Sequence, residues 1–249
     1  MGNGGFDSEP SGKILSEVLS LHLLDIPYDE EGEFLSRPNR FLVRVLLKGR
    51  EEEAHLHDPG RLPDLVQPGR PLALRYAARP GRRTRWDVLA VRICGYWCFC
   101  HSGYHRRVAA NLLFLKRPFG EFSDFEAEPR AGQGRLDFKL ETFGGPLWLE
   151  VKGVTWARGR TALFPDAPTE RGLRHLQTLR SFLREGQRAG LLFLVFRKEA
   201  EEVRPAEEIQ PAFAQALREA LSEGLEARAF VLTYDGRGIF LAREIPVRA

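Results

Sequence analysis

The sequence has few of the features that mark secreted and membrane proteins. Its 249 residues include three cysteines, which lie close together at Cys94, Cys98 and Cys100, and an odd, clustered set is a poor disulfide framework. Their spacing also lacks the paired Cys-x-x-Cys of a zinc site, so buried thiols are expected. No stretch approaches the roughly 18 consecutive apolar residues of a spanning helix, and no signal peptide is visible at Met1 to Gly5. We therefore expect a cytoplasmic protein without a membrane partner.

Missing motifs disfavour two enzyme classes. The sequence lacks the Gly-x-x-x-x-Gly-Lys loop of nucleoside-triphosphate-driven motors and the serine elbow of many hydrolases. Hydrophobic residues make up 43% and charged residues 29% of the chain, a balance that argues against wholesale disorder. The length allows two modest domains or one large one, and nothing in the sequence indicates the oligomeric state.

Surplus positive charge is concentrated in one segment. Residues 37–97 hold thirteen basic and six acidic side chains, whereas residues 1–36 hold one and eight. Of the 37 basic residues, 31 are arginine, so a compositional bias toward arginine is the alternative explanation. Bias alone does not account for the clustering, however, and a concentrated basic segment favours a polyanion partner.

The chain divides into three parts by its sequence texture. Residues 1–36 form an extension, in which apolar residues at helical spacing predict a helix over 13–24, followed by an acidic loop. Over residues 37–97, short apolar runs separated by turn signals such as Asp58-Pro59-Gly60 predict a small antiparallel barrel or sandwich. Residues 98–249 mix helical and strand patterns, which predicts an α/β domain. Its helices are expected at 105–116, 170–185 and 211–222, and its strands at 136–141, 147–154, 191–196, 229–234 and 239–242.

Three charged residues interrupt two otherwise apolar strands of this domain. Glu150 and Lys152 are two positions apart and share a strand face. If the strands form a hairpin with a two-residue turn at Phe143-Gly144, Asp137 lies opposite Glu150. A turn at Gly144-Gly145 places Asp137 opposite Lys152 instead. Both registers put the three side chains on one face, whereas a three-residue turn would direct Asp137 away.

This set has the chemistry of a metal-dependent hydrolase. Two carboxylates on one face, Asp137 and Glu150, make a hard oxygen site suited to Mg²⁺ or Mn²⁺. A lysine beside them, Lys152, can orient or help to deprotonate a water and stabilise charge on a phosphate. These are the needs of phosphodiester hydrolysis. A surface ladder of opposite charges is the alternative explanation of the same spacing.

Several motifs, taken together and in order, carry a resemblance to a known family. They are Arg37-Pro38-Asn39-Arg40-Phe41-Leu42, Asp58-Pro59-Gly60-Arg61-Leu62, Thr84-Arg85-Trp86-Asp87, Arg135-Leu136-Asp137-Phe138, Glu150-Val151-Lys152, and the run Leu163 to Gly172 with His175-Leu176. Over about residues 34–247 the chain resembles the bacterial and archaeal sugar fermentation stimulation protein A (SfsA) family. The resemblance implies an N-terminal OB-like barrel, a C-terminal domain of the PD-(D/E)xK nuclease-like fold, and DNA binding.

Further site residues follow only from this resemblance. Asp137, Glu150 and Lys152 fall on the nuclease signature. Glu128 falls where the family carries a glutamate that can act as a further metal ligand. Asp166 of the Phe-Pro-Asp motif is expected to face the same site. His175 on the next helix is a further candidate to face the phosphate, and a packed or solvated histidine is the favoured alternative.

The chain departs from the family pattern at three of these motifs. Pro129 stands where a hydrophobic residue usually follows Glu128, which puts the placement of that glutamate in doubt. Gly153 stands where the family has serine after Val-Lys, and Pro168 replaces a valine. Residues 1–33 lie outside the resemblance, so it says nothing of their role.

The basic segment supplies candidate contacts to nucleic acid. Arg40 and Arg61 lie in family motifs and are the preferred phosphate contacts, and Arg82, Arg83 and Arg85 are further candidates. Arginine contacts phosphate, while exposed aromatic side chains can stack on bases. Such a surface binds DNA, single-stranded or structured, with little sequence preference and with strong dependence on salt. The alternative is that the aromatic residues of this segment belong to the barrel core.

The sequence leaves three functions open. The first is a DNA-binding protein whose α/β domain cleaves DNA with a divalent metal, as an endo- or exonuclease. The second is a non-catalytic DNA-binding regulator of sugar-metabolism genes that keeps the nuclease fold. The intact Asp, Glu-x-Lys set favours the first. The third, an enzyme acting on a nucleotide or small phosphate, does not need the basic barrel.

Overall fold

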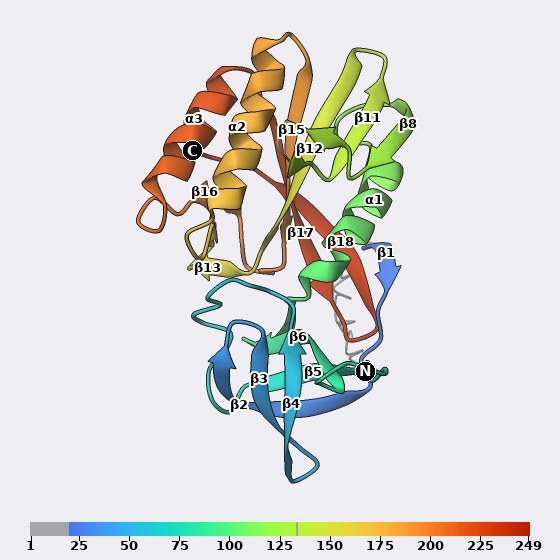
Figure 1. Ribbon diagram of the computed structural model, residues 1–249, viewed down its shortest axis with the longest axis vertical. Coiled ribbons are helices and arrows are strands. Elements are labelled where there is room, and N and C mark those ends of the chain that lie inside the picture. Colours follow the sequence, from blue (N-terminus) through green and yellow to red (C-terminus); the bar gives the residue numbers. More distant parts are fainter. Residues whose placement is uncertain (1–19, 133) are drawn as a thin grey trace, which may run out of the picture.

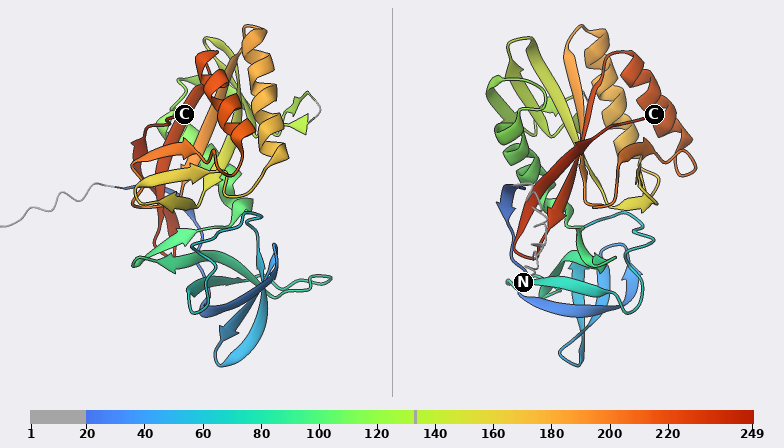
Figure 2. Two further views of the ribbon diagram at one scale, coloured as in Figure 1. Left: turned by 90° about the vertical axis from the view of Figure 1, so that its left-hand side faces the viewer. Right: turned by 180° about the vertical axis from the view of Figure 1, so that it is seen from behind.

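The computed structural model describes residues 20–132 and 134–249, which form two lobes (Figures 1 and 2). The lower lobe in Figure 1 is a β-barrel, and the upper lobe is a sheet flanked by helices. One large sheet runs through both lobes in the order β4-β3-β2-β5-β6-β7-β17-β15-β12-β11-β8. Within the described ranges, no helix is long and apolar enough to cross a membrane.

Five strands close the barrel. They are β2 (Glu30–Asn39), β3 (Leu42–Leu47), β4 (Arg50–Leu56), β5 (Pro71–Tyr76) and β6 (Trp86–Ile93). Neighbours along the path are antiparallel, and β4 closes the barrel by pairing in parallel with β6. Alternation along β3, with Val43 and Val45 buried and Arg44 exposed, sends one row of side chains into the barrel core. The small OB-like barrel that the sequence predicts is confirmed.

The helix predicted over 13–24 is wrong where the structure describes it. Residues 1–19 lie outside the described residues, and Leu21–Asp25 form strand β1, which pairs antiparallel with β18 (Gly238–Ile245). Leu23 and Leu24 are both buried. Pairing with an existing sheet edge satisfies the backbone of this segment, so tertiary contacts override its helical spacing.

The barrel also begins earlier than the expected boundary at residue 37. The acidic segment, expected to be a loop, forms the first half of β2, and Glu30 pairs opposite Leu74 of β5. Every second residue of this segment is exposed, so its acidic side chains can stay in water while Phe34 enters the core. The acidic side chains therefore made the start of a paired barrel strand look like a loop in the sequence.

The upper lobe is built on three parallel strands, β12 (Gly145–Val154), β15 (Arg188–Val195) and β17 (Glu226–Tyr234). Antiparallel strands extend the sheet: β11 (Phe138–Thr142) and β8 (Phe122–Ala127) beyond β12, and β18 and β7 (Tyr96–Phe99) beside β17. Smaller elements connect these strands. They are η1 (Ser102–Tyr104), β9 (Arg130–Ala131), β10 (Gly134–Arg135), β13 (Trp156–Arg158), β14 (Thr161–Phe164) and β16 (Glu202–Pro205).

Helices cover both faces of the sheet. On β15, Leu192 and Leu194 pack into one apolar cluster with α1 (His105–Lys116). Leu191 and Phe193 pack into the other with α2 (Glu170–Arg184) and α3 (Pro211–Ser222). This alternation explains why the sequence of β15 is continuously apolar. The predicted α/β domain is confirmed, and its predicted helices and strands match within three residues at each end.

Apolar packing fixes the two lobes against each other. One core cluster includes Leu56 and Leu89 of the barrel together with Leu192 of the upper sheet. Phe99 on the connecting strand β7 packs its ring against Phe196, with centroids 5.4 Å apart. The elements on either side of the space between the lobes are therefore held in fixed positions by this packing.

Candidate active site

The β11–β12 hairpin determines which residues face each other at the site. Phe138 pairs with Leu149 and Thr142 with Gly145, so the turn consists of Phe143 and Gly144. Extending this register by one residue places Asp137 opposite Glu150, and the Asp137 amide donates to the Leu149 carbonyl at 3.1 Å. Of the two registers that the sequence allows, the structure has the first.

Glu150 is the most buried charged residue of the site, with 3% of its surface exposed. Its Oε1 accepts a 2.6 Å hydrogen bond from Lys152 Nζ and is hydrogen-bonded to Nδ1 of His175 on α2. Burial works against ionisation, but the lysine and the histidine outweigh it and hold the pKa of Glu150 below its ordinary value. Its Oε2 is buried and has no hydrogen-bond partner among the described residues.

Asp137 lies beside Glu150, but its pKa is shifted in the opposite direction. Its Oδ2 accepts a 2.8 Å hydrogen bond from the Val151 amide. Burial and the negative charge of Glu150 raise the pKa of Asp137 to about 6. Glu150 therefore ionises first, and Asp137 releases its proton readily when a positive charge arrives between them. Two carboxylates of this kind, with one buried oxygen unpartnered, fit a hard divalent cation.

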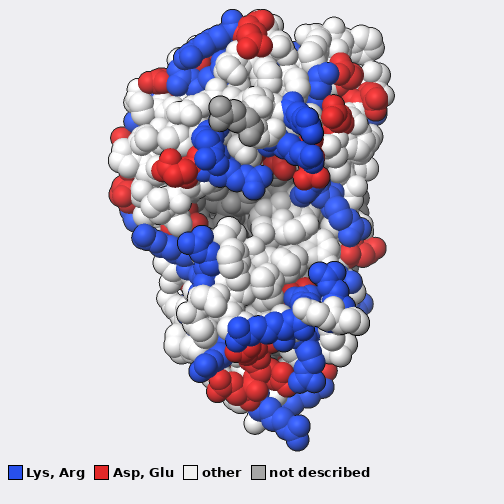
Figure 3. Space-filling view, in the orientation of Figure 1, with Lys and Arg blue, Asp and Glu red and all other residues white. Residues whose placement is uncertain are grey.

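These residues form one wall of a large cleft between the lobes. The cleft has a volume of about 1,120 Å³ and is lined by Asp137, Glu150 and Lys152 from the upper lobe and by Arg40 and Arg61 from the barrel. In Figure 3, lysine and arginine side chains border the hollow where the two lobes meet. The expected catalytic residues and the two preferred phosphate contacts therefore share one cavity that is open to solvent.

Glu128 is not among the residues that line the cleft. Its side chain is 48% exposed, and its carboxylate pairs with Arg106 at 2.6 Å. Its backbone has a positive φ of 56° at the end of β8, and its amide donates to the Asp137 carbonyl at 3.0 Å. In this conformation the backbone of Glu128 braces Asp137, while the carboxylate is held by an arginine that itself lines the cleft.

Asp166 lines the cleft and ties the two lobes together. Its Oδ2 accepts a 2.9 Å hydrogen bond from the Leu62 amide in the barrel. A Cβ at Gly60 would overlap the Asp166 carboxylate, which is why this turn needs glycine. Burial and the nearby Asp166 raise the pKa of Asp58 to about 7. Arg37 holds the barrel side of this junction in place by donating to the main-chain carbonyls of Arg40, Gly60 and Arg61.

Sequence reasoning missed His105, which packs against β12, the strand that carries Glu150 and Lys152. The ring of His105 occupies the space that a side chain at residue 153 would fill, so the glycine there, where the family usually has serine, accommodates it. Burial lowers the pKa of His105 to about 4, so the ring is neutral at pH 7. One sequence offers no signal for this pair, because the two residues are far apart in the chain.

The three other candidate phosphate contacts are engaged by acidic residues. Arg83 pairs with Glu53 at 3.3 Å and Arg85 with Glu52 at 2.7 Å, both on exposed surface. Surface pairs of this kind are weak and can exchange for a phosphate. Arg82 is different, because its guanidinium is mostly buried and pairs with both oxygens of the Asp87 carboxylate. The structure therefore disfavours Arg82 as a DNA contact.

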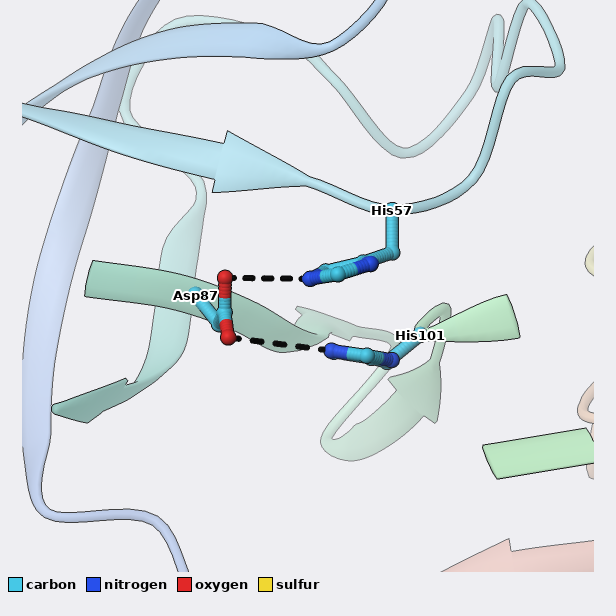
Figure 4. A group of neighbouring side chains, drawn as sticks. All are labelled: His57, Asp87 and His101. Carbon is cyan, nitrogen blue, oxygen red and sulfur yellow. Dashed lines mark hydrogen bonds and ion pairs between the residues drawn. The ribbon is translucent and has the colours of Figure 1, made fainter. Parts of the chain in front are cut away.

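Asp87 is also the centre of a histidine cluster in the barrel (Figure 4). His57 Nε2 lies 3.1 Å from Asp87 Oδ1, and His101 Nε2 lies 3.9 Å from Oδ2. These three residues could supply ligands to a metal, since their donor atoms lie within 4.8 Å of one another. The two rings stack with centroids 3.6 Å apart, and Arg82 already neutralises the carboxylate. The cluster is thus better explained as an ion-pair network that holds the β5–β6 loop.

None of the three cysteines is among the residues that line the cleft. Cys98 and Cys100 are buried and Cys94 is exposed, and all three are free thiols. Burial raises the pKa of Cys98 and Cys100 above the ordinary thiol value. The expectation of buried thiols holds for two of the three.

Comparison with known proteins gives the family. A family model described as "Sugar fermentation stimulation protein RE domain" matches residues 103–238, and one described as "SfsA N-terminal OB domain" matches residues 35–100. The chain belongs to the SfsA family. The resemblance seen in the sequence motifs is thereby confirmed, and the OB assignment of the barrel with it.

Relatives and a solved structure agree along most of the chain. A sugar fermentation stimulation protein homolog from Methanococcoides burtonii is 39% identical over 233 residues, which covers 90% of this chain and 94% of the relative. A homolog from Methanothermobacter thermautotrophicus is 41% identical over 207 residues, covering 82% and 86%. The structure of Pyrococcus furiosus SfsA in complex with Ca²⁺ matches with a TM-score of 0.84 and 28% identity, covering 92% of this chain and all of that one.

Proposed function

We propose that this SfsA protein binds DNA and hydrolyses its phosphodiester bonds with a divalent metal, Mg²⁺ or Mn²⁺. The observation that carries the proposal is the cleft wall, where Asp137 and Glu150 lie side by side next to Lys152 and one buried Glu150 oxygen has no partner among residues 20–132 and 134–249. Buried polar atoms normally have partners, so an unpartnered carboxylate oxygen fits a cation. The P. furiosus relative is described in complex with Ca²⁺, another hard cation.

Different residues of the chain would take different roles in the reaction. When bound, the metal would supply a water of lowered pKa and offset charge on the phosphate. Asp137 and Glu150 would hold it, and His175 keeps the Glu150 carboxylate in one orientation. Lys152 would orient the attacking water and counter the charge that develops on the phosphate. Glu128 would join as a ligand only if its ion pair with Arg106 opened.

The barrel would hold the DNA across the opposite wall. Arg40 and Arg61 are exposed and line the same cleft as the carboxylates. Neither has a salt bridge to an acidic residue in the described part of the chain, so both are available to phosphate. Arg83 and Arg85 would extend this contact once their surface pairs exchange. Binding of this type reads the backbone more than the bases.

A non-catalytic DNA-binding regulator of sugar-metabolism genes is the second candidate. One observation favours it. Lys152 Nζ donates a 2.6 Å hydrogen bond to Glu150, so the two opposite charges already neutralise each other without a metal or a substrate. In that case the cleft would bind DNA and leave it intact.

Incubation of plasmid and linear DNA with the protein and Mn²⁺ or Mg²⁺ separates the two candidates. We expect metal-dependent cleavage that is lost in Lys152→Ala. Lys139→Ala is the matched control, because Lys139 lies on the adjacent strand, pairs with Glu141 at 2.7 Å and does not line the cleft. Retained binding without cleavage in any of these conditions would favour the regulator.

A further inference from the structure

A second cavity lies in the barrel, between the β2–β3 turn and the β5–β6 loop. Its volume is about 620 Å³, within the roughly 300–1,000 Å³ typical of small-ligand sites. It is lined by Asn39, Phe41, Leu42, His55, His57 and residues 79–84. In OB barrels, the loops at these two positions flank the face that binds oligonucleotides or oligosaccharides. The position alone therefore allows more than one ligand class, and the lining decides between them.

The lining includes an exposed aromatic surface. Phe41 is 44% exposed, and its ring lies nearly parallel to that of His55, with centroids 6.1 Å apart and planes inclined by 17°. His57 meets His55 edge-on at 4.3 Å. The Phe41 amide donates to Asn39 Oδ1 at 2.9 Å, which fixes the turn that carries the phenyl ring. The Phe41 ring is held in place and faces solvent in the cavity, so a planar ligand can stack on it.

Positive charge accompanies the rings. Arg79 and Arg83 line the cavity from the loop, and the described lining residues include no carboxylate. The guanidinium of Arg40 lies over the phenyl ring at 5.9 Å from its centroid. Arg82 points inward to Asp87 and anchors the loop that bears the other two. A flat apolar ring flanked by cations matches a nucleotide, whose base stacks and whose phosphate is negative, better than it matches an uncharged sugar.

The cavity adjoins the cleft of the candidate active site at one residue. Asn39 lines both cavities, and its neighbour Arg40 lines the cleft. A DNA strand that leaves the cleft over Asn39 would bring its next nucleotides to Phe41. The two cavities can therefore be occupied by one strand.

We propose that the barrel cavity binds an unpaired nucleotide, so that the DNA held by this protein is single-stranded where it leaves the cleft. In a duplex both faces of each base are covered by its neighbours, and a base must leave the stack before a protein ring can pack on it. The inference rests on the proposed function for the presence of DNA, and it deepens that function by naming the form of the substrate.

Fluorescence anisotropy in EDTA, which prevents cleavage, tests this inference. The probes are a fluorescein-labelled oligothymidylate and a blunt duplex of the same length. Phe41→Ala should weaken binding of the oligothymidylate by about 5- to 140-fold, the range that stacking of one base contributes, and leave duplex binding unchanged. Phe41→Trp should restore binding. Phe143→Ala is the matched control, because Phe143 is 100% exposed at the β11–β12 turn and lies outside both cavities.

The outcomes separate the inference from the function on which it rests. An unchanged affinity of Phe41→Ala for the oligothymidylate, or an equal loss on both probes, would overturn the inference. Duplex binding by the wild-type protein without single-strand binding would overturn it too, yet leave the proposed function standing. If the wild type bound neither probe, the proposed DNA binding would fall as well. Because Phe41 is exposed, its truncation opens no core cavity, and a melting curve verifies the fold of each variant.

Discussion

Lys152 donates a 2.6 Å hydrogen bond to Oε1 of Glu150, two residues back on β12, while the buried Oε2 of the same carboxylate has no partner in the described part of the chain. This asymmetry explains two properties of the site. Lys152 and His175 keep the buried carboxylate ionised through one oxygen. The other oxygen is left for a further positive partner, and Asp137 is the neighbour that can share it.

Divalent cations should stabilise the folded protein. Mn²⁺ is expected to bind the paired carboxylates of the folded state and not the unfolded chain, so a hundredfold excess over Kd should add about 2–3 kcal/mol to the free energy of unfolding. Asp137→Asn and Glu150→Gln should each remove most of this gain, as measured by thermal unfolding with and without Mn²⁺. Glu141→Gln should keep it, because that carboxylate lies outside the cleft. The same gain in every variant would place the cation elsewhere.

The junction between the lobes should lose stability as the pH rises. Burial and Asp166 raise the pKa of Asp58 from 3.8 to about 7, so between these values the folded protein keeps a proton that the unfolded chain releases. The resulting stabilisation is complete below the unfolded pKa and is lost as the pH rises through 7.

Replacement of Asp58 by asparagine tests this pH dependence. The asparagine oxygen can still accept the 2.8 Å hydrogen bond from the Gly60 amide. Asp58→Asn should therefore be more stable than the wild type by about 1–3 kcal/mol at pH 8, with the difference shrinking toward pH 4. Urea unfolding across this range measures it, and a difference that stayed constant with pH would contradict the assignment.

The contact between His105 and Gly153 limits the size of the side chain that residue 153 can carry. Gly153→Ser, which introduces the residue usual in the family, should destabilise the protein by about 1–3 kcal/mol because the new side chain overlaps the imidazole. His105→Ala should relieve most of this cost when combined with Gly153→Ser. Gly134→Ser is the control, since its Cβ would meet open space. Additive effects in the double-mutant cycle, measured by urea unfolding, would show that the two residues do not interact.

DNA affinity should depend on salt through the arginines of the cleft. Arg40→Ala and Arg61→Ala should each reduce the slope of log affinity against log salt concentration by about 1, the contribution of one phosphate contact. Arg228→Ala should leave the slope unchanged, because Arg228 lies on β17 and pairs with Glu244 at 3.1 Å. Salt titrations of binding check this, and slopes that do not change in the cleft variants would place the DNA on another surface.

Local patterns predicted most of the fold. Helices α2 and α3 could be predicted from their apolar stripes, and strand β15 from its continuous apolar run. Burial on one or both faces of an element dictates those patterns. The N-terminal segment could not be read in this way. Leu21–Asp25 form a strand only because β18, more than two hundred residues away, offers an edge, and Glu30 joins the barrel through β5 despite its charge.

The part of the site that depends on the β11–β12 hairpin could be predicted from the sequence. The parity of β11 and β12 brings Asp137, Glu150 and Lys152 to one face whichever two-residue turn forms. Contacts between distant segments were not predictable, and these decide that His175 supports Glu150. They also decide that Arg82 turns inward to Asp87.

Anomalous diffraction from a crystal of this protein soaked in Mn²⁺ tests the central claim most directly. The account predicts a peak between the carboxylates of Asp137 and Glu150, and its absence in Asp137→Asn crystals treated in the same way. A peak only at His57, Asp87 and His101, or no peak in the cleft of the wild-type protein, would contradict it.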